Sequence, residues 1–189
     1  DISGNCISNQ SYVVHPDGFS IPYDSEKIHG ISTQLAKKIG VDISFVLNKF
    51  QEDLKKSQFM CGHNLNFDEK ILGAEYLRSD GNNPLQDFPK IDTCTEETAG
   101  ICMLKGGRGR KFKLPTLMEL YTHLFNKKFE SAHNASADVE ATALCLFKLL
   151  KDQKIHPNSL STHLDIIEKL TDLDLNKIKV IDIVHVNLF

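Results

Sequence analysis

Two short polar clusters, each at the predicted start of a helix, contain the side chains best suited to chemistry. The first is 62–68 (GHNLNFD), which ends in Asp68, and the second is 133–138 (HNASAD), in which His133 comes before Asp138. Carboxylate oxygens are preferred ligands of Mg²⁺, and an imidazole can accept a proton from water near neutral pH. In combination, these groups could catalyse metal-dependent hydrolysis.

Each cluster also has a purely structural interpretation. An acidic residue in the first turn of a helix complements the helix dipole, and Asn64 or Asn66 could cap the helix that contains Asp68. Residues five apart on a helix differ by about 140° of rotation, so His133 and Asp138 cannot face one point if both are helical. We therefore expect His133 in the loop before the helix, as either a general base or an exposed loop histidine.

Hydrophobic periodicity predicts the elements that must position the two clusters. Apolar residues recur at helical spacing from Asp42 to Leu54, and the short apolar run that follows is typical of a buried parallel strand. The predicted strands are 11–15, 58–61 and 90–94, and the predicted helices are 24–29, 32–40, 42–54, 67–77, 115–124 and 136–151. A further helix near 164–170 and a β-branched run at 178–186 are predicted beyond them. Helices that alternate with strands in this way indicate an α/β fold.

Composition places the chain among globular proteins. Of its 189 residues, 41% are hydrophobic and 25% are charged, which suits one domain with a core. No apolar run approaches the roughly 20 residues that span a bilayer, so we expect no membrane partner and a cytoplasmic location. The five cysteines include no Cys-x-x-Cys pair, which favours a reducing compartment and disfavours structural zinc.

One segment is strongly basic although the whole chain has a net charge of −3. Residues 104–113 (LKGGRGRKFK) interleave lysine and arginine with glycine and contain no acidic residue. Such a segment is either a solvated loop or a contact for a nucleic-acid backbone, in which each cation neutralises a phosphate. The candidate phosphate contacts are Lys105, Arg108 and Arg110, and Phe112 could anchor the loop or stack on a base.

Taken together, the two polar clusters resemble the second and third motifs of the DEDDh 3′–5′ exonucleases, the family of the DNA polymerase III epsilon-subunit and ribonuclease T. The second motif, Asn-x-x-Phe-Asp, is matched by Asn64, Phe67 and Asp68. The third motif, His-x-x-x-x-Asp, is matched by His133 and Asp138. The order and spacing of the motifs also agree with this family.

A third element extends the resemblance. Residues 28–32 (IHGIS) are similar to the Ile-His-Gly-Ile element near the 3′-terminal nucleotide in these enzymes, which implies that His29 contacts substrate. The resemblance spans about residues 12–150. It implies an α/β fold of the ribonuclease H-like (exonuclease) type, with a mixed central sheet flanked by helices.

The resemblance further implies a reaction, namely hydrolysis of the 3′-terminal phosphodiester of single-stranded or frayed DNA, with release of nucleoside 5′-monophosphates in proofreading or repair. Asp68 and Asp138 would ligate two Mg²⁺ or Mn²⁺ ions, and His133 would deprotonate the attacking water. Asn64 and Phe67 would shape the substrate site. A DNA polymerase subunit is an implied partner. RNA remains an alternative substrate, because no short motif here reads the 2′-hydroxyl.

The first family motif, Asp-x-Glu, has no match in the chain. We therefore expect a two-strand segment ahead of Asp1, so that residues 1–152 form an N-terminally incomplete exonuclease-like domain and 153–189 form an appendage. Two divalent cations need about four carboxylates for charge compensation, so Asp68 and Asp138 alone should bind metal poorly. The alternative is a catalytically incomplete module that binds nucleic acid or a polymerase partner.

Overall fold

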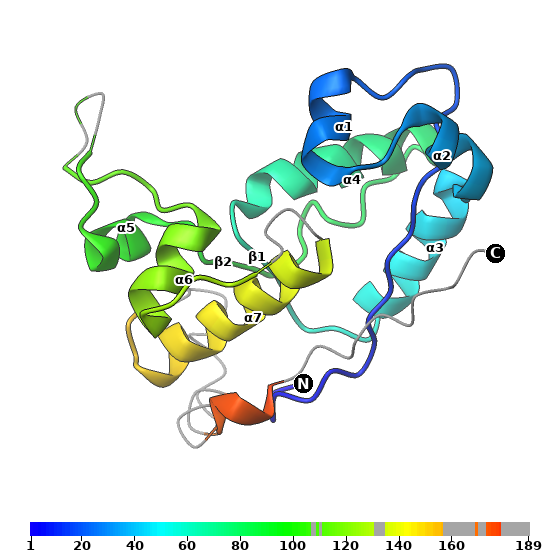
Figure 1. Ribbon diagram of the computed structural model, residues 1–189. Helices are drawn as coiled ribbons and strands as arrows, with labels where there is room; N and C mark the ends of the chain where they lie inside the picture. The colour runs from blue at the N-terminus through cyan, green and yellow to red at the C-terminus, as the bar shows by residue number, and fades with distance from the viewer. Residues whose placement is uncertain (107–108, 110, 131–134, 157–168, 170–172, 179–189) are drawn as a thin grey trace. The chain divides into compact units, whose positions relative to one another are not determined.

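The computed structural model describes residues 1–106, 109, 111–130, 135–156, 169 and 173–178, and Figure 1 shows the order of its elements. In chain order these are α1 (Tyr23–His29), α2 (Thr33–Ile39), α3 (Ile43–Leu54), β1 (Met60–Gly62), α4 (Leu65–Ser79), β2 (Lys90–Asp92), α5 (Glu96–Cys102), α6 (Leu117–Phe125), α7 (Ala135–Lys151) and the 3₁₀ turn η2 (Leu175–Lys177). β1 and β2 pair in parallel as a two-stranded sheet. The described residues therefore form a mixed α/β structure, as the alternating periodicity predicts.

The chain divides into two compact units. Unit 1 comprises residues 1–10, 61–65 and 90–189, and unit 2 comprises 11–60 and 66–89. Unit 1 contains β2, α5, α6 and α7, and unit 2 contains α1, α2 and α3. The chain passes from one unit to the other inside β1 and again after the first residue of α4, so these two elements belong to both units.

α3 illustrates how local sequence sets a helix. The side chain of Asp42 accepts a hydrogen bond from Ser44 N at 2.8 Å, which satisfies one of the amide groups that lack a helical partner. The apolar stripe of the helix then buries Leu47 and Leu54. The predicted helix at 42–54 is confirmed, with its first residue serving as the cap.

Some boundaries differ from the predictions. α4 begins at Leu65, two residues before the predicted start near Phe67. The predicted strand at 11–15 contains, among the described residues, a single isolated bridge at Val14. α5 was not predicted, although it has the same length as the predicted helices α1 and α2. The predicted helix near 164–170 and the β-branched run at 178–186 lie, apart from residues 169 and 178, outside the described residues.

A glycine lets the segment before α1 approach the end of α2. Val14 and Val41 form a parallel bridge, and His15 N donates to Val41 O at 2.9 Å. A Cβ at Gly40 would lie 2.6 Å from His15 N, closer than real side chains approach backbone. Any larger residue at this position would therefore push the two segments apart.

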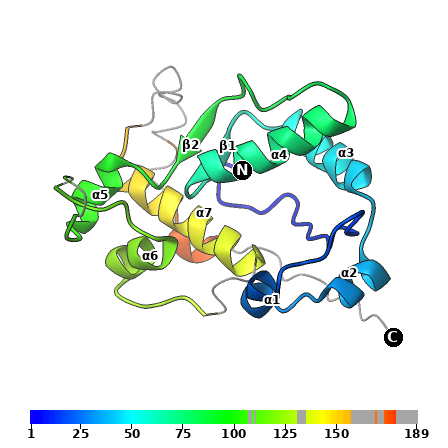
Figure 2. The same cartoon turned by 90° about the horizontal axis from the view of Figure 1, so that it is seen from above.

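The core of unit 1 lies between α6 and α7, which run side by side in both views (Figures 1 and 2). Leu120 of α6 and Leu149 of α7 are fully buried. Cys145 is buried in the same core, and its burial raises the pKa of the thiol to about 12. Beyond α7, Lys151 Nζ donates to Leu173 O at 2.6 Å, which ties η2 to this helix.

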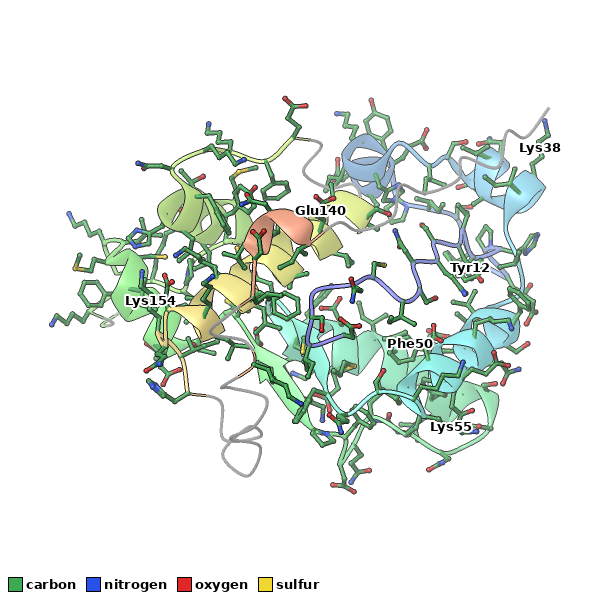
Figure 3. The ribbon with its side chains drawn as sticks, turned by 90° about the horizontal axis from the view of Figure 1, so that it is seen from below. Tyr12, Lys38, Phe50, Lys55, Glu140 and Lys154 are labelled. Carbon is green, nitrogen blue, oxygen red and sulfur yellow. The ribbon has the colours of Figure 1, made fainter. Side chains whose placement is uncertain are left out.

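Two side-chain contacts join α3 to other parts of unit 2. The ring of Tyr12, which is labelled in Figure 3 in the extended segment before α1, meets Phe45 edge to face with centroids 5.5 Å apart. On another side of α3, the buried hydroxyl of Tyr76 donates to Leu47 O at 2.7 Å. This bond joins α4 to α3 inside the unit. No helix of the described residues is both long and apolar enough to cross a membrane.

Leu149→Ala should lower the free energy of unfolding by about 2–5 kcal/mol, because a fully buried leucine loses its packing and leaves a cavity. Leu77→Ala is the matched control, since Leu77 on α4 is 55% exposed and should change stability by less than about 0.5 kcal/mol. Urea denaturation followed by circular dichroism measures both values. Equal losses in the two variants would contradict the assignment of the unit 1 core.

Candidate functional site

The turn between β1 and α4 carries the first polar cluster. β1 ends at Gly62 and α4 begins at Leu65, so only His63 and Asn64 connect strand and helix. Asn64 has a φ of 64°, in the left-handed region that asparagine tolerates better than most residues. The asparagine of the motif therefore has a backbone role in this turn, separate from any contact with substrate.

The carboxylate of Asp92, the last residue of β2, closes this turn. Its Oδ1 accepts from Asn64 N at 2.9 Å and from Cys94 N at 2.8 Å, and its Oδ2 accepts from Leu65 N at 2.9 Å. Leu65 N is the first amide of α4 and has no acceptor within the helix. The end of β2 thus caps the helix that follows β1.

His63 is held by two hydrogen bonds in the same turn. Its Nε2 donates to Pro115 O at 3.0 Å, because a carbonyl can only accept, and its Nδ1 lies 2.9 Å from Thr93 Oγ1. The Thr93 hydroxyl also lies 3.1 Å from Gly62 O and has a single proton to donate. With neutral His63 this proton points to Nδ1, and with protonated His63 it points to Gly62 O.

Burial shifts the titration of His63. Desolvation lowers the pKa of the imidazole below its ordinary value of 6.5, against the opposing effects of the Pro115 carbonyl and the Asp92 carboxylate. Both ring nitrogens bind protein groups in this arrangement. We therefore assign His63 to the support of the turn, where it links β1 to the segment before α6.

The two predicted metal ligands occupy equivalent positions in different units. Asp68 is exposed in the first turn of α4 and belongs to unit 2, and Asp138 is half-buried in the first turn of α7 and belongs to unit 1. His133 lies outside the described residues. In the part of the chain that the structure describes, no three His, Cys, Asp or Glu side chains are grouped to hold a metal.

The predicted substrate contacts are placed as follows. Phe67 is 61% exposed on α4, and His29 is exposed at the end of α1, where its Nδ1 accepts from Ile31 N at 3.0 Å. The structure brings Asn64 against Asp92. Arg108 and Arg110, predicted as phosphate contacts, lie outside the described residues.

The basic segment 104–113 begins and ends as paired backbone. Lys105 and Phe112 form an antiparallel bridge, and Lys113 N donates to Leu104 O at 3.1 Å. The ammonium of Lys111 lies 5.1 Å from the centre of the Phe112 ring, a cation–π distance. The two ends of the segment are therefore held together, and we call these ends, residues 104–105 and 111–113, the stem.

One lysine of this stem is engaged by α6. Lys113 Nζ lies 2.6 and 2.8 Å from the two carboxylate oxygens of Glu119, which also accepts from the backbone and hydroxyl of Thr116 in a capping box. Desolvation raises the pKa of Glu119, but the bonds from Lys113 and Thr116 outweigh it and keep the pKa low. Lys105 and Lys111 remain exposed and extend from the stem.

Two residues of this site were missed by sequence reasoning. Asp92 and Thr93 belong to the predicted strand 90–94, but neither was singled out, because their partners lie about thirty residues earlier in the chain. The available signal was an aspartate at the end of a strand whose parallel neighbour leads into a helix. No protein-family model matches the chain, and no curated protein matches it.

The pKa of His63 predicts a pH dependence of stability. Between the lowered pKa of the folded protein and 6.5, the unfolded chain binds more protons, so the free energy of unfolding should fall as the pH drops below 6.5. His63→Gln should remove this part of the dependence, whereas His123→Gln, at an exposed position on α6, should not. Urea denaturation from about pH 5 to 8 measures it. If the free energy of unfolding varied with pH in the same way in wild type and His63→Gln, the prediction would be contradicted.

Proposed function

We propose that the protein is a metal-dependent 3′–5′ exonuclease with a ribonuclease H-like fold. Its reaction is hydrolysis of the 3′-terminal phosphodiester of single-stranded or frayed DNA, which releases nucleoside 5′-monophosphates. The observation that carries the proposal is the position of Asp68 and Asp138, each in the first turn of a helix and each within a matching motif.

The local architecture around β1 supports this assignment. β1 and β2 are parallel, so their carboxyl ends meet at one edge of the sheet, and open α/β sheets bind ligands at such edges. α4 leaves this edge directly and presents Asp68 in its first turn. This is where the exonuclease motif requires a carboxylate.

The donors also suit the proposed cation. Asp68 and Asp138 offer oxygen ligands, which Mg²⁺ and Mn²⁺ prefer, and each lies in the first turn of a helix. We propose, from the motif resemblance, that each residue contributes ligands to a site for two such ions, which needs further carboxylates for charge compensation. Once bound, a divalent cation would stabilise the negative charge that develops on the phosphate oxygens.

The motif assigns His133 the role of general base. In the proposed step His133 takes a proton from water, the water oxygen bonds to phosphorus, and the P–O3′ bond breaks. The O3′ oxygen leaves with the shortened strand and takes up a proton from solvent to become its new 3′-hydroxyl, and the released nucleotide retains the phosphate as a 5′-monophosphate. Asn64 sets the turn before Asp68, and the exposed ring of Phe67 is available to the terminal nucleotide.

The test is release of mononucleotides from a 3′-labelled single strand in the presence of Mn²⁺, with the full-length natural protein. His133→Ala should lower kcat by about 10² to 10⁴, the usual loss of a general base, and Asp138→Asn should reduce Mn²⁺-dependent activity. His123→Ala, an exposed histidine on α6, is the matched control and should retain activity.

Two results would contradict the proposal. One is activity that survives His133→Ala and Asp138→Ala in the same chain. The other is tight binding of the strand with no release of mononucleotide, which would favour a nucleic-acid-binding module instead.

The stem of the basic segment should contribute to binding of the strand. The slope of log K against log salt is negative, and Lys105→Ala and Lys111→Ala should each reduce its magnitude by about 0.7, the value for one phosphate contact on single-stranded DNA. Lys38→Ala, the same loss of charge on α2, should leave the slope unchanged. Fluorescence anisotropy of a labelled oligonucleotide over a salt series measures the three slopes. Equal slopes in all variants would exclude the stem as a phosphate contact.

A further inference from the structure

We propose that Asp92 is a positioning residue for Asp68. Its carboxylate fixes the turn from β1 to α4 and thereby the first helical turn that carries the proposed metal ligand. The effect on activity rests on the proposed function, whereas the effect on the turn itself does not. The inference depends only on hydrogen bonds among residues of unit 1 and on the continuity of α4.

The bonding pattern requires a carboxylate. Asn64 N and Leu65 N are consecutive amides, and they donate to different oxygens of the same side chain. Cys94 N donates to Oδ1 as a second partner of that oxygen. An amide side chain would turn one NH₂ group toward a backbone N–H, so asparagine cannot reproduce all three bonds.

The bonds are also favoured electrostatically. A negative charge at the first amide of a helix interacts with the positive end of the helix dipole, and hydrogen bonds to an ionised acceptor are stronger than neutral ones. Asp92 is half-buried and both of its oxygens accept from backbone N–H groups. It is therefore committed to holding the turn and is not assigned as a metal ligand itself.

The geometry transmits this anchor to Asp68. Leu65 and Asp68 are three residues apart, so they lie on the same face of the first turn of α4. His63, the first residue of the turn, is fixed as well, because its side chain forms a hydrogen bond with Thr93, the neighbour of Asp92. Two consecutive residues at the end of β2 thus hold the segment that leads into the helix. A displacement of about 1 Å at a catalytic group can cost about a hundredfold in rate.

The experiment compares Asp92→Asn with Asp42→Asn, which makes the same change at the cap of α3. The first readout is backbone amide hydrogen exchange by NMR. In Asp92→Asn, the Leu65 amide should exchange faster while Cys94 stays protected, because the remaining oxygen keeps its partners. Asp42→Asn should leave Leu65 unchanged. Unchanged exchange at Leu65 in Asp92→Asn would overturn the inference.

The second readout is Mn²⁺-dependent release of mononucleotides. Asp92→Asn should lower kcat and raise the Mn²⁺ concentration needed for half-maximal activity, each by about 10- to 100-fold. This is the usual effect of removing a group that orients a metal ligand. KM for the strand should not change, because both Asp92 oxygens are engaged by backbone amides of the turn. A rise in KM with unchanged kcat, or no kinetic change, would overturn the positioning role.

Asp92→Glu is the second variant, because it keeps the charge and moves the oxygens by one methylene. It should show the same kinetic loss as Asp92→Asn, and wild-type kcat in this variant would overturn the geometric argument. Absence of activity in the wild-type protein would contradict the proposed function alone. In that case the exchange of the Leu65 amide still decides whether Asp92 anchors the turn.

Discussion

The first backbone amides of α4 have no acceptor inside the helix, and the structure around the candidate site depends on how they are satisfied. A carboxylate from the neighbouring strand supplies an acceptor for the first of them, Leu65 N, and for the Asn64 amide just before the helix. This arrangement requires β1 and β2 to be adjacent and parallel, because only then does the end of β2 reach the start of α4. The pairing of the strands, the conformation of the turn and the start of the helix therefore depend on one another. The left-handed backbone of Asn64 belongs to this turn conformation.

The same coupling explains which parts of the molecule could be predicted from sequence. α3 and α7 were predicted almost to the residue, because their apolar residues recur over 12 and 17 residues. α5 has the same length as α1 and α2, which were predicted, and it was missed because its start depends on a capping box between Thr95 and Thr98 that was not recognised. Hydrophobic periodicity does not reveal such a cap, which can be recognised only from the residue types at the two capping positions.

The candidate site likewise contains residues that the local sequence predicts and residues that it does not. Asp68 and Asp138 were recognised because each sits in a motif with fixed spacing, and both occur in the first helical turns expected for them. Asp92 could not be found in this way. Its partners Asn64 and Leu65 are 28 and 27 residues away in the chain, and only the pairing of two strands brings them together.

The division into two units has a consequence for biosynthesis. Unit 2 comprises 11–60 and 66–89, so all of its residues have been synthesised once the ribosome passes residue 89. Unit 1 includes 1–10 and 61–65 but takes its core from α6 and α7, which come later. Domains generally fold as units in the order in which they emerge. We therefore expect unit 2 to fold first. Segments 1–10 and 61–65 of unit 1 would pack only after the rest of that unit has been synthesised.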